Sequence, residues 1–427
     1  MRVLIISHNV FSATENMGKT LTSYFSEFPT EELAQFYIHS EIPTTNYCQN
    51  YYRITDKEAI KSIFLGSSGR IFTKEDIKLH RISARTDNGV TGSLYQKARK
   101  RTPAIYLARN LWWKLAHWNT KQLHMWLNEF KPECVFLASG DYAFIYEIAL
   151  KIAKFRRIPL YISCMDDYYF YNKNQDSVLG RWQHKLFMKS VKRAVDYSSK
   201  LFCICDKMAE DYAAYFHKPC ITVPTPATIE VPLAVEKKQK ISYLGNLGYR
   251  RNEQLIAIGQ NLKKLGLEPD HIDVYSSESR KEVLEKMTEE NGIVFHGAVG
   301  AKEVLRIMGE SLAVIHTESF DEKIRQAVCY SVSTKIADSL ASGTCIFAYG
   351  PQEIASMSYL EKNKAAVCCT DENNLENTLR MLIADKELRN SCVKNALNLA
   401  QRNHTPLCTP KIIRDVINED LTGKCRL

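Results

Sequence analysis

Acidic and basic side chains follow two predicted elements in the second half of the chain. Glu318 comes directly after an apolar strand predicted over residues 312–316, and Lys335 and Asp338 lie near the start of a helix predicted over residues 334–341. A carboxylate at a strand end beside a cation at a helix start is typical of a ligand site at the edge of a parallel sheet. A solvated loop acid at Glu318 and a surface ion pair between Lys335 and Asp338 are the alternatives.

A turn with two glycines and two arginines lies between a strand predicted over residues 241–244 and a helix predicted over residues 252–265. Glycine lets the backbone approach a ligand closely, and the guanidinium fork of arginine matches phosphate oxygens. The turn therefore indicates a phosphate site, with a plain turn carrying solvated arginines as the alternative. Its residues are Gly245, Asn246, Leu247, Gly248, Tyr249, Arg250 and Arg251.

A third candidate follows the first predicted strand, residues 3–7. The spacing of Ala13 from Gly18, Lys19 and Thr20 approaches that of a P-loop, in which helix N-terminal amides hold phosphate. Three interpretations stay open: a nucleotide hydrolase or kinase loop, a loop capped by a helix, and a loop with Gly18 that closes over a ligand held by the second half. We favour the last, because the arginine-containing turn is the stronger phosphate motif.

The net charge of +9 is concentrated in the first part of the chain. Residues 1–235 hold 31 basic and 22 acidic side chains, whereas residues 236–427 hold 26 of each. Residues 93–128 contain seven basic side chains, four of the five tryptophans and no acid. Such a segment suits an anionic membrane surface. Single-stranded nucleic acid, and a core helix that packs its tryptophans inward, are the alternatives.

Length and cysteine content narrow the class of protein. The 427 residues suggest two domains, and no run approaches the roughly 20 apolar residues of a membrane-spanning helix. The first residues lack the apolar core of a signal peptide. The 13 cysteines are odd in number and scattered, which favours free thiols in a reducing cytosol. Cys203 and Cys205 share one face of a predicted strand without further ligands nearby, so we expect no metal site.

The elements that must position these residues alternate between apolar strands and amphipathic helices, which predicts an α/β architecture with parallel sheets. We expect two Rossmann-like domains facing a cleft, over residues 1–228 and 229–405, and a return segment over 406–427 whose helix crosses back to the first domain. The predicted strands are 3–7, 134–138, 160–164, 201–205, 221–224, 241–244, 272–275, 293–295, 312–316, 344–348 and 365–369. The predicted helices are 18–28, 142–155, 181–198, 252–265, 279–290, 302–310, 334–341, 372–383 and 410–421.

At these residues the sequence resembles the retaining, nucleotide-sugar-dependent glycosyltransferases of the GT-B fold, in the family-4-like set (group 1), over nearly the whole chain. Glu318-Ser319-Phe320 resembles the family's Glu-Gly-Phe segment. Asp338 lies five residues before Gly343, where the family's second Glu sits. The resemblance implies that Glu318 lies near the donor sugar and that Asp338 binds the ribose hydroxyls of the nucleotide.

The resemblance also covers the phosphate and base sites. It implies that Ser333 and Lys335, at a Ser-x-Lys helix start, contact the diphosphate or nucleotide, and that the segment with Gly297 and Val299 lies near the nucleobase. The diphosphate loop is implied to be Gly245, Asn246 and Arg251, with Arg250 beside them.

The chain departs from the family pattern in two places. Nineteen residues separate Glu318 from Asp338, which predicts an insertion over residues 321–332. The family often has a His-Asp pair after a strand of the first domain, whereas this chain has Asp166 and Asp167 there. These carboxylates are expected either to contact the acceptor or donor, or to cap a helix.

Sugar transfer from a nucleoside diphosphate needs leaving-group stabilisation, which cationic side chains supply electrostatically without requiring a metal. We assign Arg251 and Lys335 to that role and Glu318 to orienting the donor sugar. The expected function is retaining transfer from a UDP-sugar or GDP-sugar to a glycan or glycolipid acceptor in cell-surface polysaccharide synthesis, in the cytoplasm at the inner face of the plasma membrane. A nucleotide hydrolase or kinase, and a non-catalytic membrane or nucleic-acid-binding protein, are the alternatives.

Overall fold

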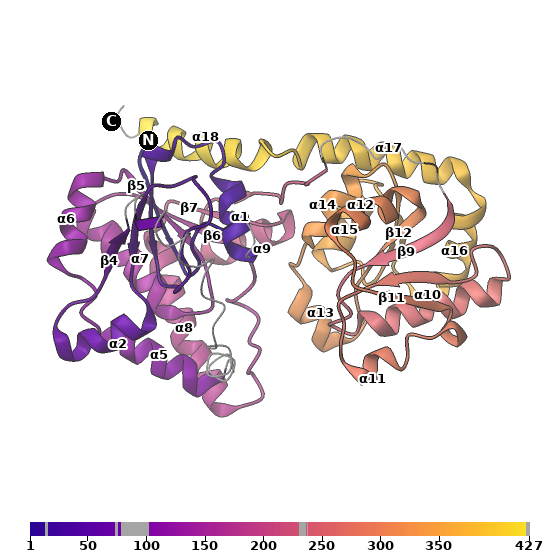
Figure 1. The fold of residues 1–427 in the computed structure, drawn as a ribbon, viewed down its shortest axis with the longest axis horizontal. Coiled ribbons are helices and arrows are strands. Elements are labelled where there is room, and N and C mark those ends of the chain that lie inside the picture. Colours follow the sequence, from indigo (N-terminus) through magenta and orange to yellow (C-terminus); the bar gives the residue numbers. More distant parts are fainter. Residues whose placement is uncertain (13–15, 73–75, 78–101, 230–235, 237, 424–427) are drawn as a thin grey trace. The chain divides into compact units, whose positions relative to one another are not determined.

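The chain forms two compact units, Met1–Val223 with Pro410–Leu427, and Pro224–Thr409 (Figure 1). The domain boundaries expected after residues 228 and 405 stay predictions. The structure is a computed structural model, and it describes residues 1–12, 16–72, 76–77, 102–229, 236 and 238–423.

The first unit is built on an eight-stranded sheet in the order β4-β3-β2-β1-β5-β6-β7-β8. Neighbouring strands pair in parallel except β3 and β4, which are antiparallel. The order reverses between β1 and β5, and ligands of such sheets bind beside this switch point. The strands are β1 Val3–Ser7, β2 Leu33–Tyr37, β3 Asn50–Arg53, β4 Arg70–Phe72, β5 Cys134–Ala138, β6 Leu160–Cys164, β7 Lys200–Cys203 and β8 Cys220–Thr222.

Helices connect most of these strands, as is usual between parallel strands, although residues 38–49 between β2 and β3 form no helix. The connection from β7 to β8, for example, is a helix that begins where Cys205 accepts a hydrogen bond from the amide of Met208. The helices of the first unit are α1 Asn16–Tyr24, α2 Asp56–Leu65, α5 Pro103–Leu115, α6 Lys121–Phe130, α7 Ala143–Arg156, α8 Val178–Tyr197, α9 Asp206–Phe216 and α18 Cys408–Gly423.

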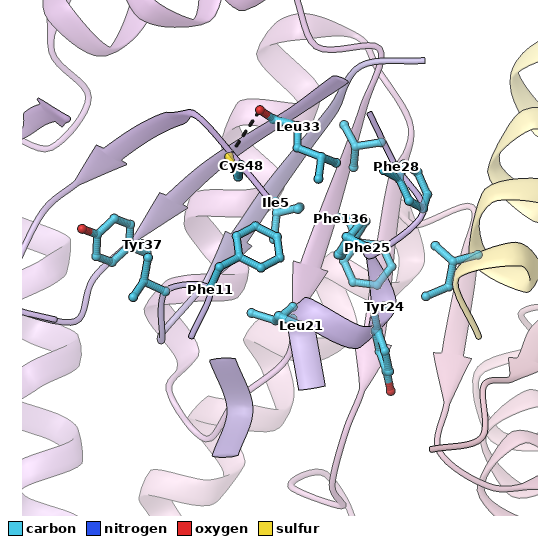
Figure 2. Close-up of a cluster of buried hydrophobic side chains, with 14 of the residues drawn as sticks. Ile5, Phe11, Leu21, Tyr24, Phe25, Phe28, Leu33, Tyr37, Cys48 and Phe136 are labelled. Carbon is cyan, nitrogen blue, oxygen red and sulfur yellow. Dashed lines mark hydrogen bonds between the residues drawn. The ribbon is translucent and has the colours of Figure 1, made fainter. Parts of the chain in front are cut away.

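Aromatic side chains from α1 and the central strands fill the core of the first unit (Figure 2). The ring of Phe25 lies edge-on to Phe28 and Phe136, with centroids 5.1 and 5.0 Å apart. Ile413 and Ile417 of α18 are fully buried in the same cluster. The C-terminal helix therefore crosses back to complete the first unit, as predicted.

The second unit has a six-stranded parallel sheet in the Rossmann order β11-β10-β9-β12-β13-β14. Its switch point lies between β9 and β12, so the loops after these two strands are the expected ligand loops. The strands are β9 Lys238–Leu244, β10 Ile272–Tyr275, β11 Ile293–Gly297, β12 Ser311–Thr317, β13 Cys345–Tyr349 and β14 Val367–Cys369.

Two helical layers cover this sheet, because successive strand residues point to opposite faces. Ala313 and Ile315 of β12 pack in a cluster with α10 and α16, whereas Val314 packs in a second cluster with α14 and α17. The helices are α10 Arg251–Leu265, α11 Lys281–Leu284, α12 Ala301–Glu310, α13 Glu322–Val328, α14 Thr334–Ala341, α15 Ala355–Lys362, α16 Leu375–Ala384 and α17 Lys386–Asn403.

The structure confirms the α/β class with two Rossmann-like units and corrects several elements. The helix predicted over residues 279–290 is wrong, since α11 ends after four residues. The segment 321–332, expected as an inserted loop, contains α13, which Asp321 caps by accepting from the amide of Ile324 at 3.1 Å. Strands β2 to β4 were not predicted. Among the described residues, no helix combines the length and apolarity needed to cross a bilayer.

Candidate active site

Arg251 and Glu318 form a two-pronged ion pair at the switch point of the second unit. Nη2 of Arg251 lies 2.8 and 2.9 Å from the two carboxylate oxygens of Glu318, and its Nε donates to the carbonyl oxygen of Thr317 at 3.2 Å. Only 1% of the Glu318 side chain is exposed. Burial raises the pKa of the Glu318 carboxyl, and the guanidinium of Arg251 opposes that shift. The structure thus brings together two residues predicted for the site from loops far apart in the sequence.

The end of β12 fixes the backbone of Glu318. Its amide donates to the carbonyl oxygen of Tyr349 at 3.0 Å, which continues the parallel pairing of β12 with β13 by one residue. A Cβ atom at Gly350 would lie 2.9 Å from the carbonyl oxygen of Glu318, so only glycine fits beside this carboxylate without a shift. The Tyr349-Gly350 turn therefore holds Glu318 in place.

Lys335 lies at the start of α14 and reaches back to the same switch point. Its Nζ donates to the carbonyl oxygen of Leu244, the last residue of β9, at 2.9 Å. Desolvation lowers the pKa of Lys335, and the positive charge of Arg251 lowers it further. Two cationic groups thus act on one region of the sheet edge, where Glu318 is paired with Arg251, and a bound anion would offset the remaining repulsion.

The loop between β9 and α10 has a strained backbone. Tyr249 and Arg250 are consecutive non-glycine residues with φ angles of 56° and 55°. Such residues cost free energy and are held only where the surrounding structure demands it. Arg250 lies 3.2 Å from Asp321, the residue that caps α13. The predicted arginine turn is thus tied to the segment inserted between Glu318 and Asp338.

Gly245 and Asn246 shape this loop. A Cβ atom at Gly245 would lie 2.6 Å from the ring of Tyr243, and the Asn246 side chain accepts a hydrogen bond from the amide of Gly248 at 2.6 Å. Tyr243 in turn donates its hydroxyl to the carbonyl oxygen of Asn246 at 2.6 Å. These contacts show that Gly245 and Asn246 stabilise the turn. Their predicted contact with the diphosphate stays a prediction.

Asp338 and Ser333 both bind backbone groups. One oxygen of Asp338 accepts from the amide and the hydroxyl of Thr228, at 2.6 and 2.8 Å. Ser333 caps α14 by accepting from the amide of Lys335 at 3.3 Å. Their predicted contacts to ribose and diphosphate stay predictions.

The segment predicted to lie near the nucleobase follows β11. Gly297 has a φ of 76°, and its carbonyl oxygen accepts from the amide of Ser276 at 2.9 Å. Val299 is half-buried just before α12. The ring of His296 stacks on Tyr275 with centroids 4.5 Å apart, which places an aromatic pair at the ends of β10 and β11.

Sequence reasoning gave no role to His316, although it lies beside the ion pair. This side chain is half-buried in β12 and its Nε2 lies 3.0 Å from the hydroxyl of Ser356. Burial, with a smaller contribution from the charge of Arg251, lowers the pKa of His316 to about 3. The sequence did offer a signal for His316, because it is a polar residue in an otherwise apolar predicted strand.

The P-loop-like motif of the first unit, with Gly18 and Lys19, is part of a helix. Gly18 packs against the loop after β1, where its Cβ would lie 2.4 Å from the carbonyl oxygen of Val10. Helix α1 begins at Asn16, so Gly18 and Lys19 lie inside it rather than at its start, unlike the corresponding residues of a P-loop. Ala13 lies outside the described residues.

Asp167 organises the loop after β6. It accepts hydrogen bonds from the amides of Tyr169, Phe170 and Tyr171, at 3.0, 2.9 and 3.1 Å. Asp166 accepts from the amide of Asp167 at 2.9 Å. The helix-cap alternative for this pair is wrong for Asp167, because it binds amides within a loop and the next helix, α8, is capped by Ser177.

The tryptophan-rich segment is partly described, from residue 102 onward. Trp113, Trp118 and Trp126 are buried and only Trp112 is substantially exposed. Arg109 is buried as well, with its Nε 3.0 Å from Asp56. Core packing therefore accounts for most of these tryptophans. In the described part of the chain, no group of three or more side chains could hold a metal ion.

Comparisons with known proteins agree with this fold. Residues 254–407 match the family model described as glycosyl transferase-like. No curated protein sequence matches the chain. Similar solved structures include HepE of Anabaena in complex with UDP, with a TM-score of 0.61 and 9% identity over 98% of this chain and 100% of that chain.

Two further solved structures are similar. Sucrose-phosphate synthase from Thermosynechococcus elongatus has a TM-score of 0.59 and 8% identity over 99% of this chain and 100% of that one. WaaG, a glycosyltransferase involved in lipopolysaccharide biosynthesis, has a TM-score of 0.55 and 11% identity over 96% of this chain and 98% of that one. At such identities the likeness establishes the fold. The chain therefore has the GT-B fold of group 1 glycosyltransferases, as its sequence predicted, and its residues 254–407 match the glycosyl transferase-like family.

Proposed function

We propose that this chain is a retaining glycosyltransferase that moves a sugar from a nucleoside-diphosphate sugar to a glycan or lipid-linked glycan. The observation that carries the proposal is the convergence of Arg251, Glu318 and Lys335 at the switch point of the second unit. The family match over residues 254–407 covers most of that unit and supports glycosyltransferase activity.

Arg251 and Lys335 stabilise the departing diphosphate in this proposal. Both cations belong to the same switch point, and the charge of Arg251 already lowers the pKa of Lys335. A bound diphosphate favours the protonated form of Lys335 and offsets the repulsion between the two groups. Because these charges are fixed before the reaction, they stabilise the charge that develops on the leaving group.

Glu318 orients the donor sugar. Its carboxylate is held by Arg251 and its backbone by the Tyr349-Gly350 turn, so the side chain is fixed in a buried position. A fixed carboxylate of this kind accepts hydrogen bonds from sugar hydroxyls and keeps the anomeric carbon aligned with the diphosphate. Retention then follows from attack on the face from which the diphosphate departs.

The remaining nucleotide contacts follow the sequence prediction. We assign the diphosphate loop to Gly245, Asn246 and Arg250, the helix-start contact to Ser333 and the ribose contact to Asp338. The base lies near Gly297 and Val299. HepE is recorded in complex with UDP, which favours a UDP-sugar over a GDP-sugar as the donor.

The acceptor side is proposed for the first unit. WaaG takes part in lipopolysaccharide biosynthesis, which supports cell-surface polysaccharide assembly as the setting. We place the protein in the cytoplasm, at the inner face of the plasma membrane, where such acceptors are extended.

A transfer assay with Glu318→Gln and Arg251→Lys tests the proposal. Each variant keeps side-chain volume close to the original but breaks the two-pronged pair, so kcat should fall roughly 100-fold or more. Glu285→Gln, at an exposed carboxylate of the same unit, is the matched control and should retain full activity. Full activity in both site variants would overturn the assignment. Loss of nucleotide turnover only in Lys19→Ala would instead favour the hydrolase or kinase alternative.

A further inference from the structure

Exposed apolar side chains gather on three helices of the first unit. Helices α2, α5 and α8 make up about a tenth of the chain. They nevertheless carry ten of the nineteen large hydrophobic side chains that are exposed among the described residues. α5 packs against both α2 and α8, so the three helices form one continuous layer (Figure 1). The ten are Phe64, Leu65, Ile105, Leu111, Trp112, Leu115, Val178, Leu179, Trp182 and Leu186.

The same helices expose a strong excess of positive charge. Among the described residues, Asp196 is the most exposed acid on them, and it is paired with Lys192 at 2.9 Å. A surface that is both apolar and basic is unusual for a soluble monomer and marks an interaction site. The exposed basic residues are Lys57, Lys61, Lys114, Arg181, Lys185, Lys189, Lys192 and Arg193.

Helix α8 arranges both kinds of side chain on one face. Val178, Trp182, Lys185, Leu186 and Lys189 follow the spacing i, i+4, i+7, i+8 and i+11, which places them along one side of a helix. Trp182 is 53% exposed and Val178 is 74% exposed. The opposite side of the helix packs Phe187 and Val191 into the unit. Because one face of α8 is buried in the unit, its apolar and basic face points outward.

An open groove of about 570 Å³ runs along this face. Its walls combine the rings of Tyr169 and Trp182 with Leu186, and the side chains of Lys185 and Lys189 line it as well. An apolar floor with ammonium groups beside it suits a molecule with a hydrocarbon part and an anionic head.

We propose that the layer of α2, α5 and α8, centred on the outer face of α8, docks the first unit onto an anionic lipid bilayer. Trp182 and Leu186 insert at the level of the headgroups, where an indole ring is favoured. Lys185 and Lys189 extend along the apolar surface and place their ammonium groups among anionic headgroups. This places the membrane contact on α8 rather than on the tryptophans of residues 93–128, three of which are buried. It does not depend on the proposed transferase activity.

Sedimentation of the full chain with lipid vesicles tests the proposal. We expect binding to phosphatidylcholine vesicles that contain about one third phosphatidylglycerol and little binding to pure phosphatidylcholine, because surface charge attracts each lysine. Lys185→Glu with Lys189→Glu should lower the affinity at least about 20-fold, at roughly fivefold per lysine removed. Trp182→Ser with Leu186→Ser should lower it roughly tenfold or more.

A matched control is available in the second unit. Lys281→Glu with Lys286→Glu changes the net charge by the same amount at exposed positions and should leave vesicle binding unchanged. Circular dichroism of all variants establishes that they are folded. Equal binding to neutral vesicles, or equal loss in the control, would overturn the proposal. Concentration-dependent dimerisation of the chain that Trp182→Ser abolishes would also overturn it, because the face would then be a protein interface.

Discussion

At the scale of single residues, the site depends on two cations with different acceptors. Nη2 of Arg251 donates to both carboxylate oxygens of Glu318, and Nζ of Lys335 donates to the carbonyl oxygen of the last residue of β9. Because both cations are partly desolvated, a diphosphate gains more from them than it would from solvated side chains. The contribution of the Lys335 charge should therefore be measurable as a pH dependence of nucleotide affinity.

Lys335→Arg should broaden the pH range of UDP binding. The pKa of Lys335 is lowered by desolvation and then by Arg251, so the free protein loses this charge at a lower pH than an ordinary lysine would. UDP favours the protonated form, and its affinity should decline as the pH rises through the alkaline range. Arginine keeps its charge over that range. Titration calorimetry at several pH values checks this, and parallel pH profiles in both proteins would contradict it.

Acid should destabilise the second unit through His316. Its pKa falls from 6.5 to about 3 on folding, so protonation favours the unfolded chain, and the stabilisation present above pH 6.5 is lost as the pH falls toward 3. Wild type should lose about 2 kcal/mol more than His316→Gln between pH 7 and pH 5. Urea unfolding followed by circular dichroism measures the difference, and equal losses would contradict it.

At the scale of elements, the loop from β9 to α10 stores backbone strain beside the site. Tyr249 and Arg250 both have left-handed φ angles, and Arg250 is tied to Asp321 at the start of α13. The segment between the two family-like acids is therefore a short helix anchored to the arginine turn rather than an independent loop.

Replacing Tyr249 separates strain from side-chain loss. Tyr249→Gly and Tyr249→Ala both remove the ring, but only glycine adopts a φ of 56° without steric cost. The glycine variant should be more stable than the alanine variant by about 1 kcal/mol. Urea unfolding of the two variants provides the comparison. A more stable alanine variant would show that the loop relaxes and holds no strain at this position.

The sequence predicted strands that consist of apolar runs and missed those that do not. β1, β5, β6 and β10 have the predicted bounds because their buried residues are nearly all apolar. β2 contains Gln35, which is fully buried and donates to the hydroxyl of Ser7 at 2.8 Å, so its pattern resembled that of a loop. β3 and β4 have only four and three residues, and in such short strands the period of apolar residues carries little information.

The candidate site was predictable as a set of residues but not as a set of contacts. Glu318, Arg251 and Lys335 were predicted, because each follows a strand or starts a helix. The hydrogen bonds of Asp338 to Thr228 join residues 110 positions apart, and such pairs follow from tertiary packing rather than from a local pattern.

At the scale of the whole chain, the C-terminal helix belongs to the core of the first unit although it follows the second in sequence. Ile413 and Ile417 of α18 are fully buried there, and Asp420 accepts from the hydroxyl of Tyr161 at 3.0 Å and pairs with Lys200 at 2.8 Å. The first unit therefore depends on chain segments from both ends of the sequence.

Ile417→Ala should destabilise the first unit by about 2–4 kcal/mol, through lost burial and the cavity that remains. All five tryptophans lie between residues 112 and 182, so tryptophan fluorescence reports on the first unit alone. Urea unfolding followed by fluorescence should shift to lower urea, while Leu267→Ala, at a partly exposed side chain of the second unit, should leave it unchanged. An unshifted transition in Ile417→Ala would contradict the assignment of α18 to this core.

The central claim is that the switch point of the second unit binds a nucleoside diphosphate through Arg251 and Lys335. Titration calorimetry of UDP, with GDP and ADP as competitors, tests it on wild type, Arg251→Lys, Lys335→Met and Lys19→Ala. Wild type and Lys19→Ala should bind UDP equally, and the two site variants should bind at least about tenfold more weakly, because each loses a charged hydrogen bond. Unchanged UDP affinity in both site variants, or loss of binding in Lys19→Ala alone, would contradict the account.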